Sequence, residues 1–361
     1  MRFLLPLLLV ASACTAASAE TVATTAPATA ATSTTLPLAT TTTTSTTTTS
    51  TTTTTTAPPP TTSTTTTTVP NSTEATFELA HTVTGTISPK SVVSSGTGLF
   101  FAQNMMYSHT ITVYDEVGEL LATIPDDVVL SDHGFTEYEG SYRGAPVEVD
   151  FASDGSYAYV SNYEMYGNGF SRPGSDGCGV GDWDESFVYG IDTERLEITE
   201  VIAVGAVPKF LAVSPDDRLV VVSNWCSHDV SIIDTALGEE TARIPIGRHP
   251  RGVAITGDSR VAYVAVMGGR DIAVVWLAEP HPVEYIRNVG ASPRHLVLDP
   301  GGQYLYATLN GSGQVIKIDL GTWKVVGSVA TGSAPRSMDI AADGRSLYVV
   351  NYNSNTVSKV R

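Results

Sequence analysis

One phrase recurs throughout residues 76–361, and it limits the possible folds more than any other feature. It runs from Gly-x-x-Pro-Lys/Arg through an apolar segment and a turn to Tyr-Val-x-Asn, and then to Val-x-x-Ile-Asp. The prolines that mark its copies are Pro89, Pro146, Pro208, Pro250, Pro293 and Pro335. The last four prolines are separated by 42, 43 and 42 residues. Such a period, filled with short apolar segments, is typical of four-stranded β-propeller blades.

The third copy shows how one blade is built. Apolar, β-branched segments at 210–214, 219–224, 230–234 and 241–246 alternate with turn residues such as Pro215 and Asp216. Segments of this length and composition are expected to be buried strands. We therefore predict an all-β fold, a β-propeller of six four-stranded blades. Seven blades stay an alternative. The first two copies are longer, because Pro125 to Gly144 and Tyr166 to Glu185 are additional connections.

The last copy ends at Arg361, directly after its third strand. The segment Phe77 to Ile87 precedes the first proline in the way that fourth strands precede the later ones. We expect it to complete the last blade, which would close the ring with one strand from each terminus and remove both free edges.

The best copy of the phrase lies at the C-terminus. Residues 348–358 read YVVNYNSNTVS, which resembles the motif that names the YVTN family of β-propeller repeats. Weaker copies are Tyr159 to Asn162, and Val221 to Asn224 followed by Asp229 to Asp234. The resemblance covers the region from Phe77 to Arg361 and implies the propeller fold. Because the family includes surface-layer, binding and enzyme-associated propellers, it does not imply one activity.

The N-terminal region predicts export. Residues 1–19 read as a signal peptide with an Ala17-Ser18-Ala19 cleavage site. Alternatively, residues 11–14 resemble a lipobox, in which 1–13 are removed and Cys14 is lipidated. Between residues 21 and 70, 29 of 50 residues are Thr, so residues 20–75 are expected to be a disordered Thr/Pro-rich stalk that carries a propeller at 76–361. Either signal predicts an extracytoplasmic protein, secreted or lipid-anchored.

Charge and cysteine content narrow the choice of partners. The formal net charge is −17, which disfavours nucleic acid and limits membrane association to a lipid anchor. We expect a monomer. Apart from Cys14, the two cysteines Cys178 and Cys226 fall in the same kind of loop on neighbouring blades, which predicts a disulfide. A thiolate function beside His228 stays an alternative.

A candidate ligand site follows from residues that occupy the same place in each copy. The loops that enter first strands and the loops that leave second strands lie on one face of a propeller, around the channel mouth. The first set carries cations directly after the prolines, at Lys90, Lys209, Arg251, Arg294 and Arg336. The second set carries amides at Asn104, Asn162, Asn224 and Asn351, with Trp225 and Tyr352 as apolar walls. On an acidic protein, these groups favour a small anionic ligand. The alternative is structural: the Asn side chains cap turns, and the cations pair with acids of neighbouring blades.

Signals for catalysis are weak. The chain has no G-x-S-x-G, H-E-x-x-H or C-x-x-C-H motif, so we assign no catalytic residue, metal or cofactor. Metal ligation stays an alternative for His109, His228, His249 and His295, and Ca²⁺ binding for Asp176, Asp182 and Asp184. We expect a binding or cell-surface interaction module, with an unknown protein or a small anion as partner. The alternatives are a propeller lactonase-like hydrolase, or an accessory protein of a periplasmic quinoprotein or copper redox system.

Overall fold

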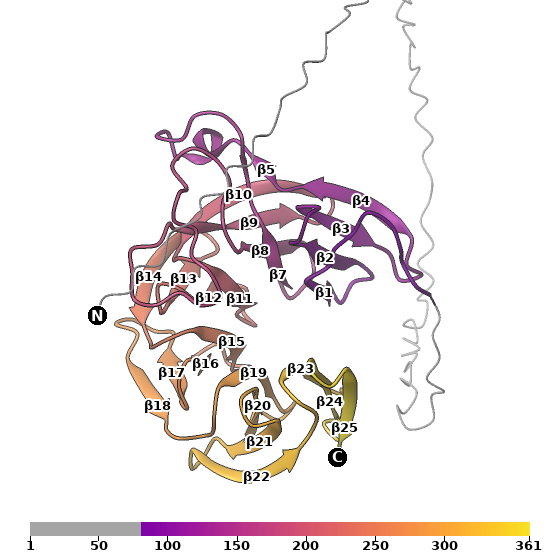
Figure 1. The fold of residues 1–361 in the computed structure, drawn as a ribbon, viewed down its shortest axis with the longest axis vertical. Helices are drawn as coiled ribbons and strands as arrows, with labels where there is room; N and C mark the ends of the chain where they lie inside the picture. Colours follow the sequence, from indigo (N-terminus) through magenta and orange to yellow (C-terminus); the bar gives the residue numbers. More distant parts are fainter. Residues whose placement is uncertain (1–80) are drawn as a thin grey trace, which may run out of the picture. The chain divides into compact units, whose positions relative to one another are not determined.

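The computed structural model describes residues 81–361, which form six blades in sequence order around a common axis (Figure 1). The first blade comprises β1 (Ser91–Ser94), β2 (Phe100–Asn104), β3 (Thr110–Tyr114) and β4 (Leu120–Pro125). The second comprises β7 (Pro146–Phe151), β8 (Tyr157–Asn162), β9 (Ser186–Asp192) and β10 (Glu197–Val204). The third comprises β11 (Pro208–Val213), β12 (Leu219–Asn224), β13 (Asp229–Asp234) and β14 (Glu239–Pro245).

The remaining blades repeat this arrangement. The fourth comprises β15 (Pro250–Ile255), β16 (Val261–Val266), β17 (Ile272–Trp276) and β18 (Val283–Ile286). The fifth comprises β19 (Pro293–Leu298), β20 (Tyr304–Leu309), β21 (Gln314–Asp319) and β22 (Lys324–Ala330). The sixth comprises β23 (Pro335–Ile340), β24 (Leu347–Asn351) and β25 (Thr356–Val360). All neighbouring strands pair antiparallel, which confirms the predicted all-β propeller with six blades.

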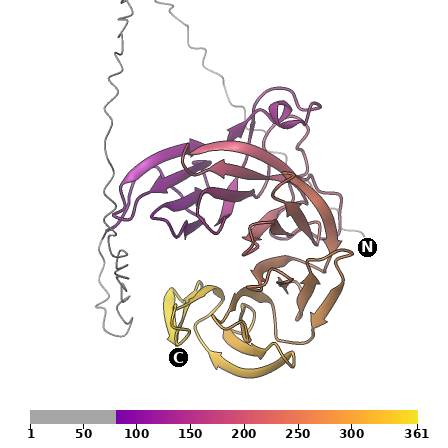
Figure 2. The same ribbon diagram turned by 180° about the vertical axis from the view of Figure 1, so that it is seen from behind.

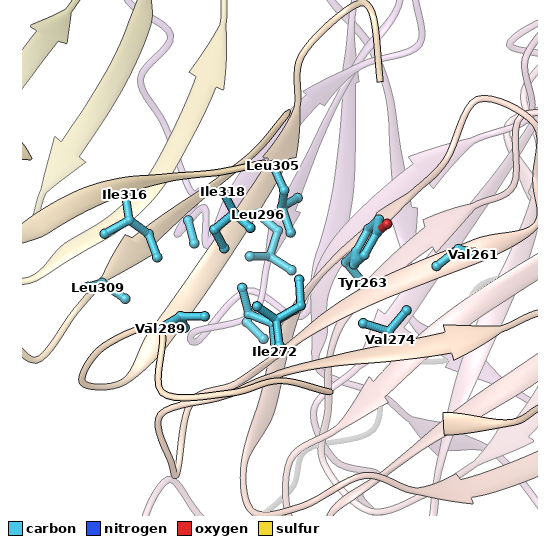
Figure 3. Packing of buried hydrophobic residues seen from close by; sticks show 13 residues of the cluster. Val261, Tyr263, Ile272, Val274, Val289, Leu296, Leu305, Leu309, Ile316 and Ile318 are labelled. Atoms are coloured by element: carbon cyan, nitrogen blue, oxygen red, sulfur yellow. The ribbon is translucent and has the colours of Figure 1, made fainter. Parts of the chain in front are cut away.

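Apolar side chains between adjacent blades form the core. Figure 3 shows the contact between the fourth and fifth blades, where Tyr263 and Ile272 face Leu305 and Ile318. Ile272, Leu305 and Ile318 are completely buried, and burial of each such side chain contributes roughly 1.5–3 kcal/mol. Equivalent clusters join the other neighbouring blades. The alternating apolar pattern of each strand therefore serves two interfaces, one on each face of its blade.

The Gly-x-x-Pro part of the phrase has a steric cause. In the third blade, a Cβ added to Gly205 would lie 2.6 Å from Nδ2 of Asn224, at the end of β12. Glycine at this point lets the connection between blades cross directly over that side chain. The backbone N–H of Trp225 then donates to the carbonyl of Val207, which ties the second strand to the start of the first.

The two additional connections pack on each other beside the second blade. The first contains the short strands β5 (Asp127–Val128) and β6 (Tyr142–Arg143), with the 3-10 turn η1 (Leu130–His133) between them. Tyr138 of this connection stacks on Phe170 of the second, with ring centroids 5.1 Å apart. Aromatic residues of both connections belong to one buried cluster, which holds the two long loops together. Within residues 81–361, η1 is the only helical segment, and no helix is long and apolar enough to span a membrane.

The predicted closing strand, residues 77–87, is wrong where it can be checked. Residues 81–87 form no strand, and the sixth blade has three strands within the described chain. Residues 83–87 instead line a cavity of about 550 Å³ together with β3 and β4, and the hydroxyl of Ser108 donates to the carbonyl of Thr86 at 3.2 Å. Residues 83–87 thus lie against the first blade. Figures 1 and 2 both show the first and sixth blades as the two ends of an open ring.

Several predictions concern residues outside the described region. These are the signal peptide at 1–19, Cys14, the stalk at 20–75, the first residues of the expected propeller, and residues 77–80 of the expected closing strand.

Candidate functional site

Five cationic side chains occupy one position of the repeat, at the start of each inner strand except β7. Lys90 directly precedes β1, and the other four are the second residues of their strands: Lys209 in β11, Arg251 in β15, Arg294 in β19 and Arg336 in β23. The inner strands of successive blades contact one another. We call these five residues the cation cluster.

The pKa values of the cluster reflect how close its members are. Partial loss of water lowers the pKa of Lys90, and the charges of Arg251, Arg336 and Arg294 lower it further. Burial also lowers the pKa of Arg294, with additional contributions from Arg251 and Arg336. Cations of the first, fourth, fifth and sixth blades therefore act on one another, as expected for groups around one axis.

Lys209 lies in an aromatic and acidic setting. Its ammonium forms an ion pair with Asp176 and lies 4.0 Å from the ring centroid of Trp225 and 5.2 Å from that of Tyr163. Burial lowers the pKa of Lys209 to about 8, although the hydrogen bond and charge of Asp176 oppose the shift. Trp225 is itself buried and stacks on His249 at 4.2 Å. Trp225, which was predicted as an apolar wall of the ligand site, thus packs against the ammonium of Lys209.

Arg251 reaches across the third blade. Its Nη2 lies 3.2 Å from Oε1 of Glu148 in β7, while Nη1 donates to the carbonyl of Lys209. Both charged side chains are largely buried, with 8% and 16% of their surfaces exposed. This pair therefore fastens the inner strands of the second, third and fourth blades to one another.

The other three cations have no carboxylate partner within the described residues. Arg294 is half-buried and donates to the carbonyl of Arg336, and Arg336 lies 3.6 Å from the ring centroid of Tyr352, which is 55% exposed. The structure thus divides the cluster into two paired members and three unpaired ones.

The four asparagines lie inside the blades. Asn104, Asn162, Asn224 and Asn351 are fully or almost fully buried at the ends of second strands. Their amide groups donate within their own blades: Asn224 donates to Asp229 and Ser231, and Asn351 donates to Ser358 at 2.9 Å. In this conformation they offer no surface to a ligand. The geometry supports the structural alternative, in which Asn ties the second strand to the third.

The residues considered as metal ligands are dispersed. His249 contacts His228 edge-on, but His109 lies on the first blade near Asp126. His295 is half-buried in the fifth blade, and loss of water lowers its pKa to about 3. Asp176 pairs with Lys209, whereas Asp182 and Asp184 pair with Arg172. No three His, Cys, Asp or Glu side chains among residues 81–361 are grouped as a metal site.

The predicted disulfide is present and shapes the site. Cys178 and Cys226 are bonded, with their Cα atoms 5.7 Å apart. The bond fixes the second-blade connection against the loop between β12 and β13 of the third blade, where Trp225 Nε1 donates to the carbonyl of Asp176 at 3.2 Å.

Sequence reasoning missed Glu148 as a member of the site and considered Asp176 only for Ca²⁺. Tyr163 follows Asn162 in the same loops of the repeat, but only Trp225 and Tyr352 were predicted as walls. One signal was available for Glu148. The second blade has Val147 where other copies have a cation, and the next residue is an acid. No comparable signal existed for Asp176, because its connection lies outside the repeat.

Fold and site together define a six-bladed β-propeller with an uneven ring of cations at the starts of its inner strands. The model of the YNCE-like β-propeller family matches residues 187–360, from β9 to β25. This match confirms the resemblance to YVTN-type propellers over that segment.

Individual relatives are distant. Hydrazine synthase subunit beta of Kuenenia stuttgartiensis is 28% identical over 104 residues, and the match covers 22% of this chain and 27% of that protein. A solved hydrazine synthase of that organism covers 79% of this chain and 99% of its own, with 19% identity and a TM-score of 0.49. A proposed 6-phosphogluconolactonase from Bacteroides fragilis is 16% identical with a TM-score of 0.52, covering 75% of this chain and 79% of its own. The chain thus matches only about a quarter of its curated relative, and the likeness to the Bacteroides structure shows the fold alone.

Proposed function

We propose that this protein is an extracytoplasmic binding propeller that takes a small anionic ligand at the cation cluster. The observation that carries the proposal is Arg294. The charges of Arg251 and Arg336 act on its guanidinium, which is partly removed from water and forms no ion pair with a carboxylate among the described residues. A guanidinium cannot relieve this repulsion by losing its proton at neutral pH. A bound anion would relieve it through charge-assisted hydrogen bonds.

The charge balance supports the same proposal. The five cations of the cluster face two acids, Glu148 and Asp176, so positive charge is in excess on a protein whose net charge is −17. Such a local reversal of sign attracts anions. The Cys178–Cys226 disulfide supports the extracytoplasmic part, because disulfides persist in oxidising compartments. No observation favours the hydrolase or redox-accessory alternatives over binding.

The experiment is isothermal titration of the purified protein with acetate, succinate, citrate and phosphate at constant ionic strength. We expect saturable binding of at least one of these anions and a loss of about tenfold or more in Arg294→Gln, as for a charged hydrogen bond.

Arg345→Gln is the matched control, because Arg345 is exposed in the turn between β23 and β24, at the opposite end of β23 from Arg336. Equal losses in the two variants, or no binding of any of the four anions, would contradict the proposal.

A further inference from the structure

The second-blade connection, which is not part of the repeat, brings a carboxylate to the cation cluster. Asp176 forms an ion pair with Lys209 and accepts a hydrogen bond from the hydroxyl of Tyr163 at 3.2 Å. Partial burial alone would raise the pKa of Asp176, but the hydrogen bond and charge of Lys209 outweigh it and hold the pKa below its usual value. The Asp176 charge also raises the pKa values of Lys90 and Arg294, which shows how far its influence reaches into the cluster.

The backbone that carries this carboxylate is anchored on both sides. The carbonyl of Asp176 accepts from Trp225, and two residues later Cys178 is bonded to Cys226. The carbonyl of Cys178 also lies 2.7 Å from Nε2 of His249, on the fourth blade. The Asp176 side chain, in contrast, is 82% exposed. The carboxylate can therefore turn into solvent by rotation about its own bonds while the loop stays in place.

The groups that hold Asp176 form a site for a carboxylate. They are the ammonium of a lysine side chain that is only 10% exposed, a phenol hydroxyl that donates, and the indole face that the ammonium contacts. These three groups can bind the carboxylate of a ligand in the same way as they bind the carboxylate of Asp176. An ion pair with one exposed partner is worth little, so a ligand with further contacts to Arg294 or Arg336 can displace it.

We propose that Asp176 is an internal competitor for the anion site, and that the ligand is a small carboxylic acid whose carboxylate replaces Asp176 on Lys209. The inference rests on the proposed function and adds the ligand class and a specificity-determining residue. In the free protein Asp176 compensates Lys209, and in the complex it turns away.

The test is titration of the wild-type chain, Asp176→Asn and Asp182→Asn with succinate, and for comparison with acetate, citrate and phosphate. Asp182 is the matched control, because it lies on the same connection, is 86% exposed, and pairs with Arg172 outside the cluster. Both substitutions remove one negative charge. We expect Asp176→Asn to bind succinate about fivefold more tightly, the upper range for loss of a competing exposed ion pair, and Asp182→Asn to stay within about twofold of wild type. Melting curves of all three proteins check that the fold is kept.

Four other results would count against this inference. If wild type binds succinate and the two variants bind it equally well, Asp176 does not compete, whereas the proposed function stands. If Asp176→Asn binds more weakly, Asp176 contacts the ligand rather than excluding it. If phosphate gains as much as succinate, the ligand class is wrong. If neither wild type nor Asp176→Asn binds any of the four anions, both proposals fail.

Discussion

The ion pair between Glu148 and Arg251 allows a quantitative test of how the inner strands are held together. Glu148→Gln keeps the size of the side chain and removes its charge, which leaves the guanidinium of Arg251 buried without a counter-charge. Arginine does not lose its proton, so the cost cannot be avoided by neutralisation. The two side chains are 8% and 16% exposed, so the substitution breaks a largely buried pair.

The expected loss of stability is about 3 kcal/mol, at the lower end of the range for breaking a buried pair, since neither group is completely enclosed. One kcal/mol shifts the melting temperature of a domain of this size by about 2–4 °C, so we expect a decrease of roughly 6–12 °C. Scanning calorimetry at pH 7 measures it. Glu194→Gln, an exposed acid in the turn between β9 and β10, is the matched control and should change the melting temperature by less than about 2 °C.

The double variant Glu148→Gln/Arg251→Met completes the experiment. Because it removes both charges, it should regain most of the stability lost by Glu148→Gln. The reasoning is refuted if the single variant melts within about 2 °C of wild type, or if the double variant is less stable than the single one.

Two further predictions concern glycine packing and buried charge. Gly205→Ala should lower the melting temperature, because the added Cβ would lie 2.6 Å from the Asn224 amide. Gly257→Ala is the control and should not lower it, because a Cβ there would have no atom within 4 Å. Equal melting temperatures of the two variants would contradict this prediction. Burial, followed by the charge of Asp127, raises the pKa of Asp126 from 3.8 to about 8, and the stability this provides is present below the unfolded pKa and is lost as pH rises towards 8. Asp126→Asn should therefore lose less stability than wild type between pH 5 and pH 8 in thermal melts, and parallel curves would refute the assignment.

Much of the fold can be predicted from the sequence, because it depends on local patterns. The spacing of the prolines predicts the number of blades, and the apolar segments of the third copy coincide with β11 to β14 within one or two residues. The disulfide was also predictable, since Cys178 and Cys226 fall in the same kind of loop on neighbouring blades.

The predictions that failed or gained no support share one cause: they were made from position in the repeat, which does not specify the contacts of a residue in the folded chain. The segment before β1 was assigned to the sixth blade by analogy with later connections, but nothing in residues 81–87 specifies which blade they contact. The asparagines were assigned to a ligand by their position in the repeat, and only their depth in the structure shows that they bond within their own blades.

By itself, the sequence determined the repeating blade, its strands and the cation that opens five of the six copies. These features recur at a fixed period and depend on neighbours within one or two blades. Only the tertiary structure decided which cations are neutralised. Arg251 meets Glu148 across 103 residues, and Asp176 meets Lys209 across 33, from a connection that follows no repeat. Such pairs are set by where the folded chain brings distant residues together, because charges interact through space and not along the sequence.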